Sequence, residues 1–332
     1  MNKTLSKILG GLYGQALGDA WAMPAHLHPD DTWEAYNGWI ETFEEPPAGH
    51  PAHDGLPAGR ITDDTEQAFA IAEVMIEEKQ VTPEGVAKAI ILWYDRVNGD
   101  TNPYVGPSTR RAVLALKAGK DIMTTGSFGD TDGAAMRISP IGLIHPGDVE
   151  GAILDAYRSC IPTHRTGVAI SGAAAVAASI AVAMQENSTL DEIIEAGIAA
   201  GEEGRKLGNR WMGASIPKRI KIAVDIARSD SPIRDRIQEL YDIIGTGLAM
   251  SEAVPAAYGA LVLGEGDPKQ TAIYAAAMSG DADTVAAMAC AIAGAWKGVE
   301  VFEQEIIDTL KKVNPELDFE TTAQGLFELI KA

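Results

Sequence analysis

The sequence predicts an all-α fold, and three observations support this class. Apolar residues recur at spacings of three and four along most of the 332 residues, which is the period of an amphipathic helix. Alanine, the strongest helix former, is abundant throughout. Alternation of period two, which is typical of strands, is absent over useful lengths. No linker rich in proline, glycine or serine divides the chain, so we expect a single domain over residues 1–332.

The chain begins with a predicted helix and a long loop. Residues 5–20 show helical periodicity, whereas residues 24–59 are rich in proline, histidine and acidic side chains and follow no period. Long loops in compact domains are often functional. This loop therefore either overhangs a site or is a tolerated surface insertion.

The helices after this loop are recognised by their start signals and periodicity. One begins at Asp64, with Thr62 or Asp63 as its N-cap. Another begins at Thr82-Pro83, because proline favours the first helical position. Further helices are predicted over residues 107–119, 148–160, 164–185, 189–207, 217–228, 233–244, 254–263, 269–278, 283–296, 303–311 and 322–330.

Two stretches depart from ordinary amphipathic sequence. Residues 124–144 include a glycine-rich segment that fits no period, where backbone amides can approach a ligand closely. Residues 167–184 lack charges and approach transmembrane length, but they are mostly alanine, glycine and serine, whose transfer energies into lipid are small. We therefore expect a buried central helix there, and no membrane association.

Composition limits the partners and the compartment. The net charge of −20 repels polyanions and argues against nucleic-acid binding, so an anionic small ligand needs local compensation. Cys160 and Cys290 have no second thiol nearby, and the N-terminus lacks the sustained apolar stretch of a signal peptide. We expect a cytoplasmic protein. The oligomeric state cannot be derived from the sequence.

Two acidic clusters carry the chemistry that the sequence predicts. Thr62-Asp63-Asp64-Thr65 and Asp281-Ala282-Asp283-Thr284 each precede a predicted helix. Each cluster taken alone is explained by helix capping, but a cap uses only one side-chain oxygen. Together the clusters supply more oxygen ligands than capping requires. An all-oxygen pocket of this kind suits hard divalent cations such as Mg²⁺ or Mn²⁺.

The sequence resembles the ADP-ribosylglycohydrolases nearly from end to end. The resemblance rests on five motifs in the family's order, namely GQALGDA (14–20), TDDT (62–65), GAAMRISP (133–140), Thr163-His164 and GDADT (280–284). It implies a compact orthogonal multi-helix bundle with a binuclear centre of two Mg²⁺ or Mn²⁺ ions in a cleft. The ligands implied are Thr62, Asp63, Asp64, Asp281, Asp283 and Thr284.

The resemblance also implies a glycosidase reaction at the anomeric carbon of a ribose, in which an N- or O-glycosidic bond is hydrolysed. In that reaction the two ions would orient the sugar and lower the pKa of a water molecule, and a nearby carboxylate would take its proton. Asp63 and Asp64 are both candidates for this catalytic base. Asp19, in the Gly-Asp-Ala motif, is expected to brace the site from outside the ligand set.

Several residues are expected to contact the substrate. The loop 126–133 resembles the family's diphosphate-side loop, which implicates Ser127, Phe128, Gly129, Asp132 and Gly133, followed by Met136. Phe128 either stacks on a base or ribose or packs into the core. His164 either lines the cleft or is a structural hydrogen-bonder. His26 stands in the place where the family commonly has a glutamate.

Three functions are compatible with these residues. The first is hydrolysis of an ADP-ribosyl conjugate, either a small molecule or a modified protein. The second is hydrolysis of a nucleoside or another small ribosyl compound without diphosphate, which His26 and the extra acids Asp130 and Asp132 favour. The third is a metal-stabilised binding or structural protein without catalysis, against which the two intact clusters argue.

Overall fold

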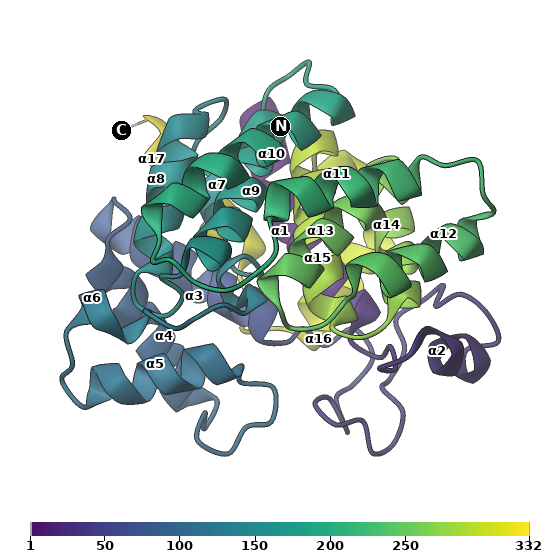
Figure 1. Ribbon diagram of the computed structural model, residues 1–332, viewed down its shortest axis with the longest axis horizontal. Helices are drawn as coiled ribbons and strands as arrows, with labels where there is room; N and C mark the ends of the chain where they lie inside the picture. The colour runs from purple at the N-terminus through teal and green to yellow at the C-terminus, as the bar shows by residue number, and fades with distance from the viewer. Residues whose placement is uncertain (1, 332) are drawn as a thin grey trace.

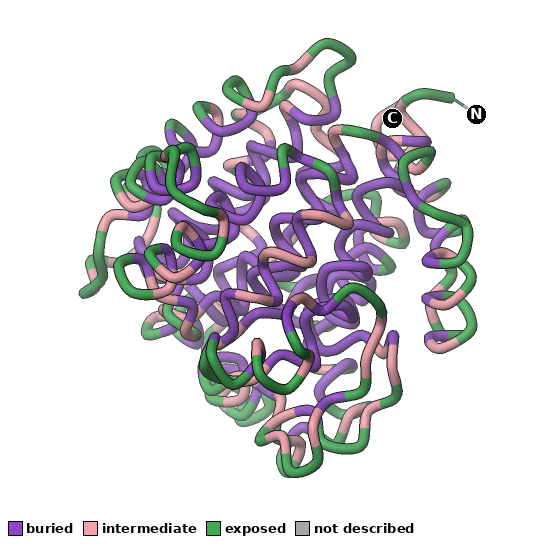
Figure 2. The backbone as a smooth tube through the Cα atoms, turned by 90° about the vertical axis from the view of Figure 1, so that its right-hand side faces the viewer, coloured by how far each residue is buried: buried purple, intermediate pink, exposed green. Residues whose placement is uncertain are grey.

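Helices α1 (Lys3–Ala22), α9 (Gly167–Ala183) and α15 (Ala282–Lys297) form the centre of the molecule in the computed structural model, which describes residues 2–331 (Figure 1). Most residues of these helices are buried, and Figure 2 shows the buried backbone gathered at the centre of the molecule, with the exposed residues around it. Within residues 2–331 there is no strand, only two isolated bridges. The predicted all-α class is confirmed.

The remaining helices follow the chain around this centre. In the first half they are α2 (Pro29–Ala35), α3 (Asp63–Glu78), α4 (Pro83–Arg96), α5 (Pro107–Lys117), α6 (Ile122–Thr125), α7 (Ser139–Leu143) and α8 (Val149–Cys160). In the second half they are α10 (Leu190–Leu207), α11 (Ile216–Ala227), α12 (Ile233–Glu239), α13 (Met250–Leu263), α14 (Pro268–Met278), α16 (Gln304–Val313) and α17 (Phe319–Lys331). Short turns lie at Asp132–Ala134, Leu240–Ile244 and Val299–Val301.

Most predicted helix starts are confirmed by their caps. Thr82 accepts a hydrogen bond from the Gly85 amide ahead of α4, and Asp148 accepts one from the Gly151 amide ahead of α8. Thr189 and Glu192 form a reciprocal capping box at the start of α10. Local sequence signals therefore fixed these boundaries within a few residues.

Three predictions about elements were wrong. The loop 24–59 contains α2, which is too short to show periodicity, although Pro29 stands at its first position and His28 caps it. The helix predicted over 254–263 begins at Met250, because Pro255 lies inside α13 rather than at its start. The segment 233–244 is divided between α12 and a π-helical turn.

The uncharged helix α9 lies in the core, as expected. Of its residues only Val182 is not buried, and α8, α10, α13 and α15 pack around it. No helix in the described part of the chain is both long and apolar enough to cross a bilayer.

Helices α1 and α15 approach each other with their backbones in contact. A Cβ atom built on Gly10, Gly14 or Gly18 would lie 2.0–2.2 Å from a carbonyl oxygen of α15, those of Gly294, Cys290 and Ala286 respectively. Only glycine allows this spacing, because no real Cβ atom tolerates such a contact. The close antiparallel approach brings Asp19, at the end of α1, next to the start of α15.

Substitution of Gly14 by alanine is expected to destabilise the protein. Alanine gains about 1 kcal/mol of helix propensity, but the clash with the Cys290 carbonyl overpacks the core, at a net cost of about 1–3 kcal/mol. Urea unfolding followed by circular dichroism measures the difference. Lys3→Ala, at the exposed start of the same helix, is the control and should change little. A Gly14→Ala protein as stable as the wild type would contradict this account of the packing.

Candidate functional site

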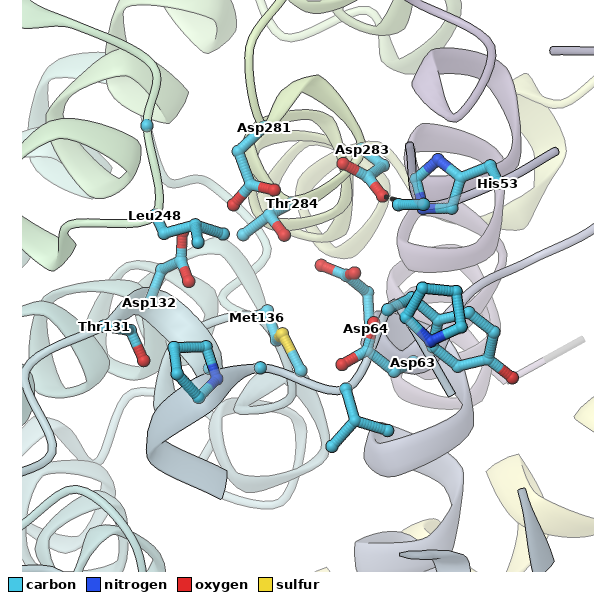
Figure 3. A pocket seen from close by; sticks show the side chains of 18 of the residues that line it. His53, Asp63, Asp64, Thr131, Asp132, Met136, Leu248, Asp281, Asp283 and Thr284 are labelled. Carbon is cyan, nitrogen blue, oxygen red and sulfur yellow. Dashed lines mark ion pairs between the residues drawn. The ribbon is translucent and has the colours of Figure 1, made fainter. Parts of the chain in front are cut away.

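The two acidic clusters meet at one cavity of about 370 Å³. Asp63 and Asp64, at the start of α3, lie across it from Asp281 and Asp283, at the start of α15 (Figure 3). These segments are more than 200 positions apart in the chain. The close packing of α1 on α15 and the contact of α1 with α3 bring them together.

Asp19 fixes the start of α3. Its carboxylate accepts hydrogen bonds from the backbone amides of Thr62 and Thr65, at 3.0 and 3.1 Å, and from both hydroxyls, at 2.9 and 2.6 Å. The first amides of a helix lack partners within the helix, so Asp19 caps α3 from a different element. This relieves the neighbouring Asp63 and Asp64 of capping.

The capping explanation fails for both clusters. Thr62 and Asp281 are the N-cap residues of α3 and α15, yet neither side chain accepts a capping hydrogen bond from a backbone amide of its own helix. The Thr62 hydroxyl instead lies within hydrogen-bonding distance of the Asp19 and Asp64 carboxylates. Another role must account for these carboxylates.

Three carboxylate oxygens around the cavity are buried and have no hydrogen-bond partner. They are Oδ1 of Asp64, Oδ2 of Asp132 and Oδ2 of Asp281. A buried charged oxygen without a partner is costly. Asp132 and Asp281 can relieve this cost by sharing a proton, whereas a bound cation relieves it at all three oxygens. In addition, Asp19, Asp64 and Asp283 each place a carboxylate oxygen within 4.8 Å of the others. The residues present therefore fit a divalent metal ion.

The electrostatics of the cavity lead to the same requirement. Burial raises the pKa of Asp63, Asp64, Asp132 and Asp283 well above the ordinary value, and the like charges of neighbouring carboxylates raise it further. So many adjacent carboxylates cannot all ionise at neutral pH without a compensating positive charge. A divalent ion supplies that charge, and oxygen donors are the ligands that Mg²⁺ and Mn²⁺ prefer.

A buried hydrogen-bonded chain holds Asp63. The Gln67 side-chain amide donates to Asp63 Oδ2 at 3.0 Å, and Arg137 donates to Gln67 Oε1 at 2.6 Å and to the Thr163 hydroxyl at 2.6 Å. Burial lowers the pKa of Arg137 to about 10, so its guanidinium stays charged at neutral pH. Asp63 therefore has a fixed orientation and a positive charge nearby.

The predicted substrate residues divide into two groups. Asp132, Gly133 and Met136 line the cavity, together with Thr131. Ser127, Phe128 and Gly129 are not among the lining residues. Phe128 is 57% exposed and lies against Trp211, with 5.5 Å between the ring centroids, so it is not a core aromatic.

The two histidines singled out from the sequence lie outside the cavity lining. His164 is fully buried behind Gly133, between the hydroxyls of Thr131 and Thr163. Burial holds the pKa of His164 well below its usual value, so the ring is neutral. The backbone carbonyl of His26 accepts the Gly280 amide of the second cluster, while its Nε2 is buried without a partner.

The long loop overhangs the site, which decides between the two alternatives for residues 24–59. His50, Ala52 and His53 of this loop line the cavity, and Nε2 of His53 lies 3.3 Å from Asp283 Oδ2. Neither histidine was expected at the site from the sequence. Their spacing of three within a histidine-rich loop was the only signal.

The residues on the rim of the cavity formed by the turn between α4 and α5 were also not expected from the sequence. Tyr104, Val105 and Gly106, in the turn between α4 and α5, line the cavity together with Pro107 and Thr109 at the start of α5. Nothing in the sequence connects this turn to the acidic clusters, because the connection depends on how α5 packs.

Comparison with known proteins identifies the fold and the family. The whole chain, residues 1–332, matches the family model described as ADP-ribosylglycohydrolase. The uncharacterised protein YegU of Escherichia coli strain K12 is 33% identical over 96% of both chains. ADP-ribosylhydrolase ARH3 of Bos taurus is 28% identical over 90% of this chain and 87% of its own.

A solved structure supports the same assignment at the level of the fold. A chain described as an ADP-ribosylglycohydrolase-related protein complex superposes with a TM-score of 0.70, covering 99% of both chains at 21% identity. Because the family match spans the whole sequence, the chain belongs to the ADP-ribosylglycohydrolase family and is a glycohydrolase.

Proposed function

We propose that this protein is a single-domain, divalent-metal-dependent hydrolase that cleaves the glycosidic bond at the anomeric carbon of ribose in an ADP-ribosyl conjugate. One observation carries the metal dependence, namely the three buried carboxylate oxygens without partners around one cavity. The substrate class rests on the family and on relatives such as the bovine ADP-ribosylhydrolase ARH3.

The residues that would hold two ions come from both clusters. The predicted ligands Asp63, Asp64, Asp281, Asp283 and Thr284 line the cavity. The remaining predicted ligand, Thr62, is bound to Asp19 and Asp64 through its hydroxyl, which keeps lone pairs available. When bound, Mg²⁺ or Mn²⁺ would orient the ribose hydroxyls and lower the pKa of a water molecule.

We assign the catalytic base to Asp63 and a ligand role to Asp64. Gln67 and Arg137 orient Asp63 and favour the ionised form that a proton acceptor requires. Bound ions would have to complete this stabilisation, because burial and the neighbouring carboxylates raise the pKa of Asp63. Asp64 keeps a buried oxygen with no partner, as a ligand requires. Asp63 takes a proton from water, the water oxygen bonds to the anomeric carbon, and the glycosidic bond breaks with its electrons moving to the leaving atom.

The start of α5 is suited to compensate the charge of a diphosphate. In the described part of the chain, no lysine or arginine lines the cavity. The first turn of α5 reaches the rim, and the free amides of a helix start attract anions. A neighbouring groove shares Val105 and Pro107 with the cavity and carries Arg110 and Arg111.

The glycine-rich loop 126–133 is less suited to this task than its sequence implies. The backbone amides of Ser127, Gly129 and Asp132 donate to carbonyl oxygens of Thr124, Gly126 and Leu248, so they are committed within the protein. Asp130, which argued against an anionic ligand, points to the indole N–H of Trp211 instead of the cavity.

Substitution of Arg111 by glutamine is expected to raise KM for an ADP-ribosyl substrate by about tenfold, the value of one charge-assisted hydrogen bond. The exposed guanidinium donates through Nη2 to the Phe128 carbonyl and to the Ser108 hydroxyl, and Arg111 lines the neighbouring groove. Steady-state kinetics measure the effect. Lys120→Gln, at another position of this groove, is the control and should change KM little. Equal KM values for the wild type and Arg111→Gln would exclude Arg111 from substrate binding.

A second candidate function is hydrolysis of a nucleoside or another ribosyl compound without diphosphate. The observation in its favour is the anionic lining, in which Asp132 adds a further carboxylate and, among the described residues, no lysine or arginine compensates it. A neutral substrate avoids the repulsion that a diphosphate meets in such a cavity.

A side-by-side assay separates the two functions. The metal-loaded protein is incubated with ADP-ribosyl-arginine, ADP-ribosyl-serine peptides and a panel of nucleosides, and the released ADP-ribose or base is quantified. Release of ADP-ribose, with the nucleosides intact, is the expected result. Turnover of nucleosides alone would establish the second function. No release of ADP-ribose by a protein with confirmed bound metal would refute the ADP-ribosyl assignment.

A further inference from the structure

His53 is held between a backbone carbonyl and the metal cavity. The residue is 6% exposed, with Nδ1 3.0 Å from the Met23 carbonyl oxygen and Nε2 3.3 Å from Asp283 Oδ2. Figure 3 shows the ring of His53 beside the Asp283 carboxylate. Among the described residues, no other histidine nitrogen forms an ion pair with a carboxylate of the predicted ligand set.

The contact with Met23 fixes which nitrogen carries the hydrogen. A carbonyl oxygen only accepts, so Nδ1 must be the donor. The lone pair of Nε2 in the neutral ring then faces a carboxylate oxygen, and two acceptors repel each other. Either a proton on Nε2 or a cation bound by both atoms relieves this repulsion.

The separation favours a shared cation over a proton. A charge-assisted hydrogen bond between an imidazolium and a carboxylate is about 2.7–2.9 Å long, whereas this contact is 3.3 Å. Adjacent ligands of one octahedral ion, each at about 2.1 Å from it, lie about 3 Å apart. Metal-bound histidines also typically donate their other ring N–H to a carbonyl or carboxylate, as His53 does to Met23.

We propose that Nε2 of His53 is a metal ligand that shares an ion with Asp283. This inference rests on the proposed metal-dependent function and adds a nitrogen to the all-oxygen set predicted from the sequence. Mg²⁺ strongly prefers oxygen, whereas first-row transition ions also accept imidazole. The site should therefore select Mn²⁺ over Mg²⁺, and residues 24–59 should be part of the metal centre.

His50 is a matched control within the same loop. Its ring stacks on that of His53 at 4.9 Å, but both of its nitrogens are committed to the backbone. Nδ1 accepts the amides of Ala52 and His53, and Nε2 donates to the Ala25 carbonyl. His50 therefore lines the cavity without a free lone pair for an ion.

The test is pulsed electron paramagnetic resonance of the Mn²⁺-loaded protein at one and two equivalents, which detects nitrogen bound to the ion. Wild type, His50→Ala, His53→Ala and His53→Gln are compared, with circular dichroism as the check on folding. We expect nitrogen coupling in the wild type and His50→Ala, and none in either His53 variant. Calorimetry should show the preference for Mn²⁺ over Mg²⁺ falling roughly 10- to 100-fold in His53→Gln.

The outcomes separate this inference from the proposed function. Bound Mn²⁺ without nitrogen coupling in the wild type would overturn the role of His53 and leave the metal-dependent hydrolase intact. Coupling that persists in folded His53→Ala would assign the nitrogen to another residue and also overturn it. Absence of any bound Mn²⁺ or Mg²⁺ would refute the metal-dependent function itself. The wild-type spectrum decides even if the His53 variants do not fold.

Discussion

Replacement of Asp64 by asparagine is expected to weaken metal binding by more than about 100-fold, since even residues that only support ligands contribute 10- to 100-fold. Hydrolysis should be lost with the metal. Asparagine also removes one of several mutually repelling buried carboxylates, so the metal-free variant should be more stable than the metal-free wild type. Calorimetry with Mn²⁺ and thermal unfolding with and without the ion measure both effects.

Asp130→Asn is the matched control, because the Asp130 carboxylate accepts from Trp211 and is not among the lining residues of the cavity. Wild-type metal affinity is expected for this variant. At a free-ion concentration 100 times Kd, a bound ion stabilises the wild type by about 2.7 kcal/mol, and Asp64→Asn should lose this gain. Metal-induced stabilisation that survives in Asp64→Asn would exclude Asp64 as a ligand.

Replacement of Asp63 by asparagine is expected to lower kcat by about 10²–10⁴-fold, the usual contribution of a general base. Because we assign the proton transfer to Asp63 and the essential ligand role to Asp64, metal binding should weaken far less than in Asp64→Asn. Steady-state kinetics at saturating Mn²⁺, together with calorimetry, separate the two roles. A complete loss of bound metal in Asp63→Asn would make Asp63 primarily a ligand.

Gln67→Leu tests the support of Asp63 without removing its carboxylate. Loss of the 3.0 Å hydrogen bond to Asp63 Oδ2 and of the link to Arg137 should reduce kcat less than Asp63→Asn does. Metal affinity should stay at the wild-type level. A variant with wild-type kcat would show that Asp63 does not need this orientation.

The parts of the molecule that could be predicted from the sequence are those that local signals determine. Threonine, aspartate and proline at helix starts predicted most boundaries, since capping acts over three or four residues. The acidic clusters could be recognised because they carry more side-chain oxygen atoms than two helix caps use. That the two clusters converge was implied by the family resemblance. Helix α1 explains the convergence physically, because Gly14 and Gly18 let it pack closely on α15 and Asp19 caps the start of α3.

The parts that could not be predicted depend on tertiary packing. Nothing local shows that His53 reaches Asp283, or that Gly106 at the start of α5 reaches the same cavity. The sequence suggested that Ser127 and Phe128 lie at the cavity, and their actual position also depends on tertiary packing. The loop 126–133 lines the cavity only from Thr131 onward. The cytoplasmic location and the absence of nucleic-acid partners stay predictions from composition.

The central claim is that the two acidic clusters form one divalent-metal site. The most direct measurement is anomalous X-ray scattering from crystals grown with Mn²⁺, which locates the ions without reference to activity. We predict two peaks in the cavity, with Asp64, Asp281 and Asp283 as ligands and His53 against one of them. A well-ordered cavity with no anomalous peak, at an Mn²⁺ concentration that saturates a relative of known metal dependence, would contradict this claim.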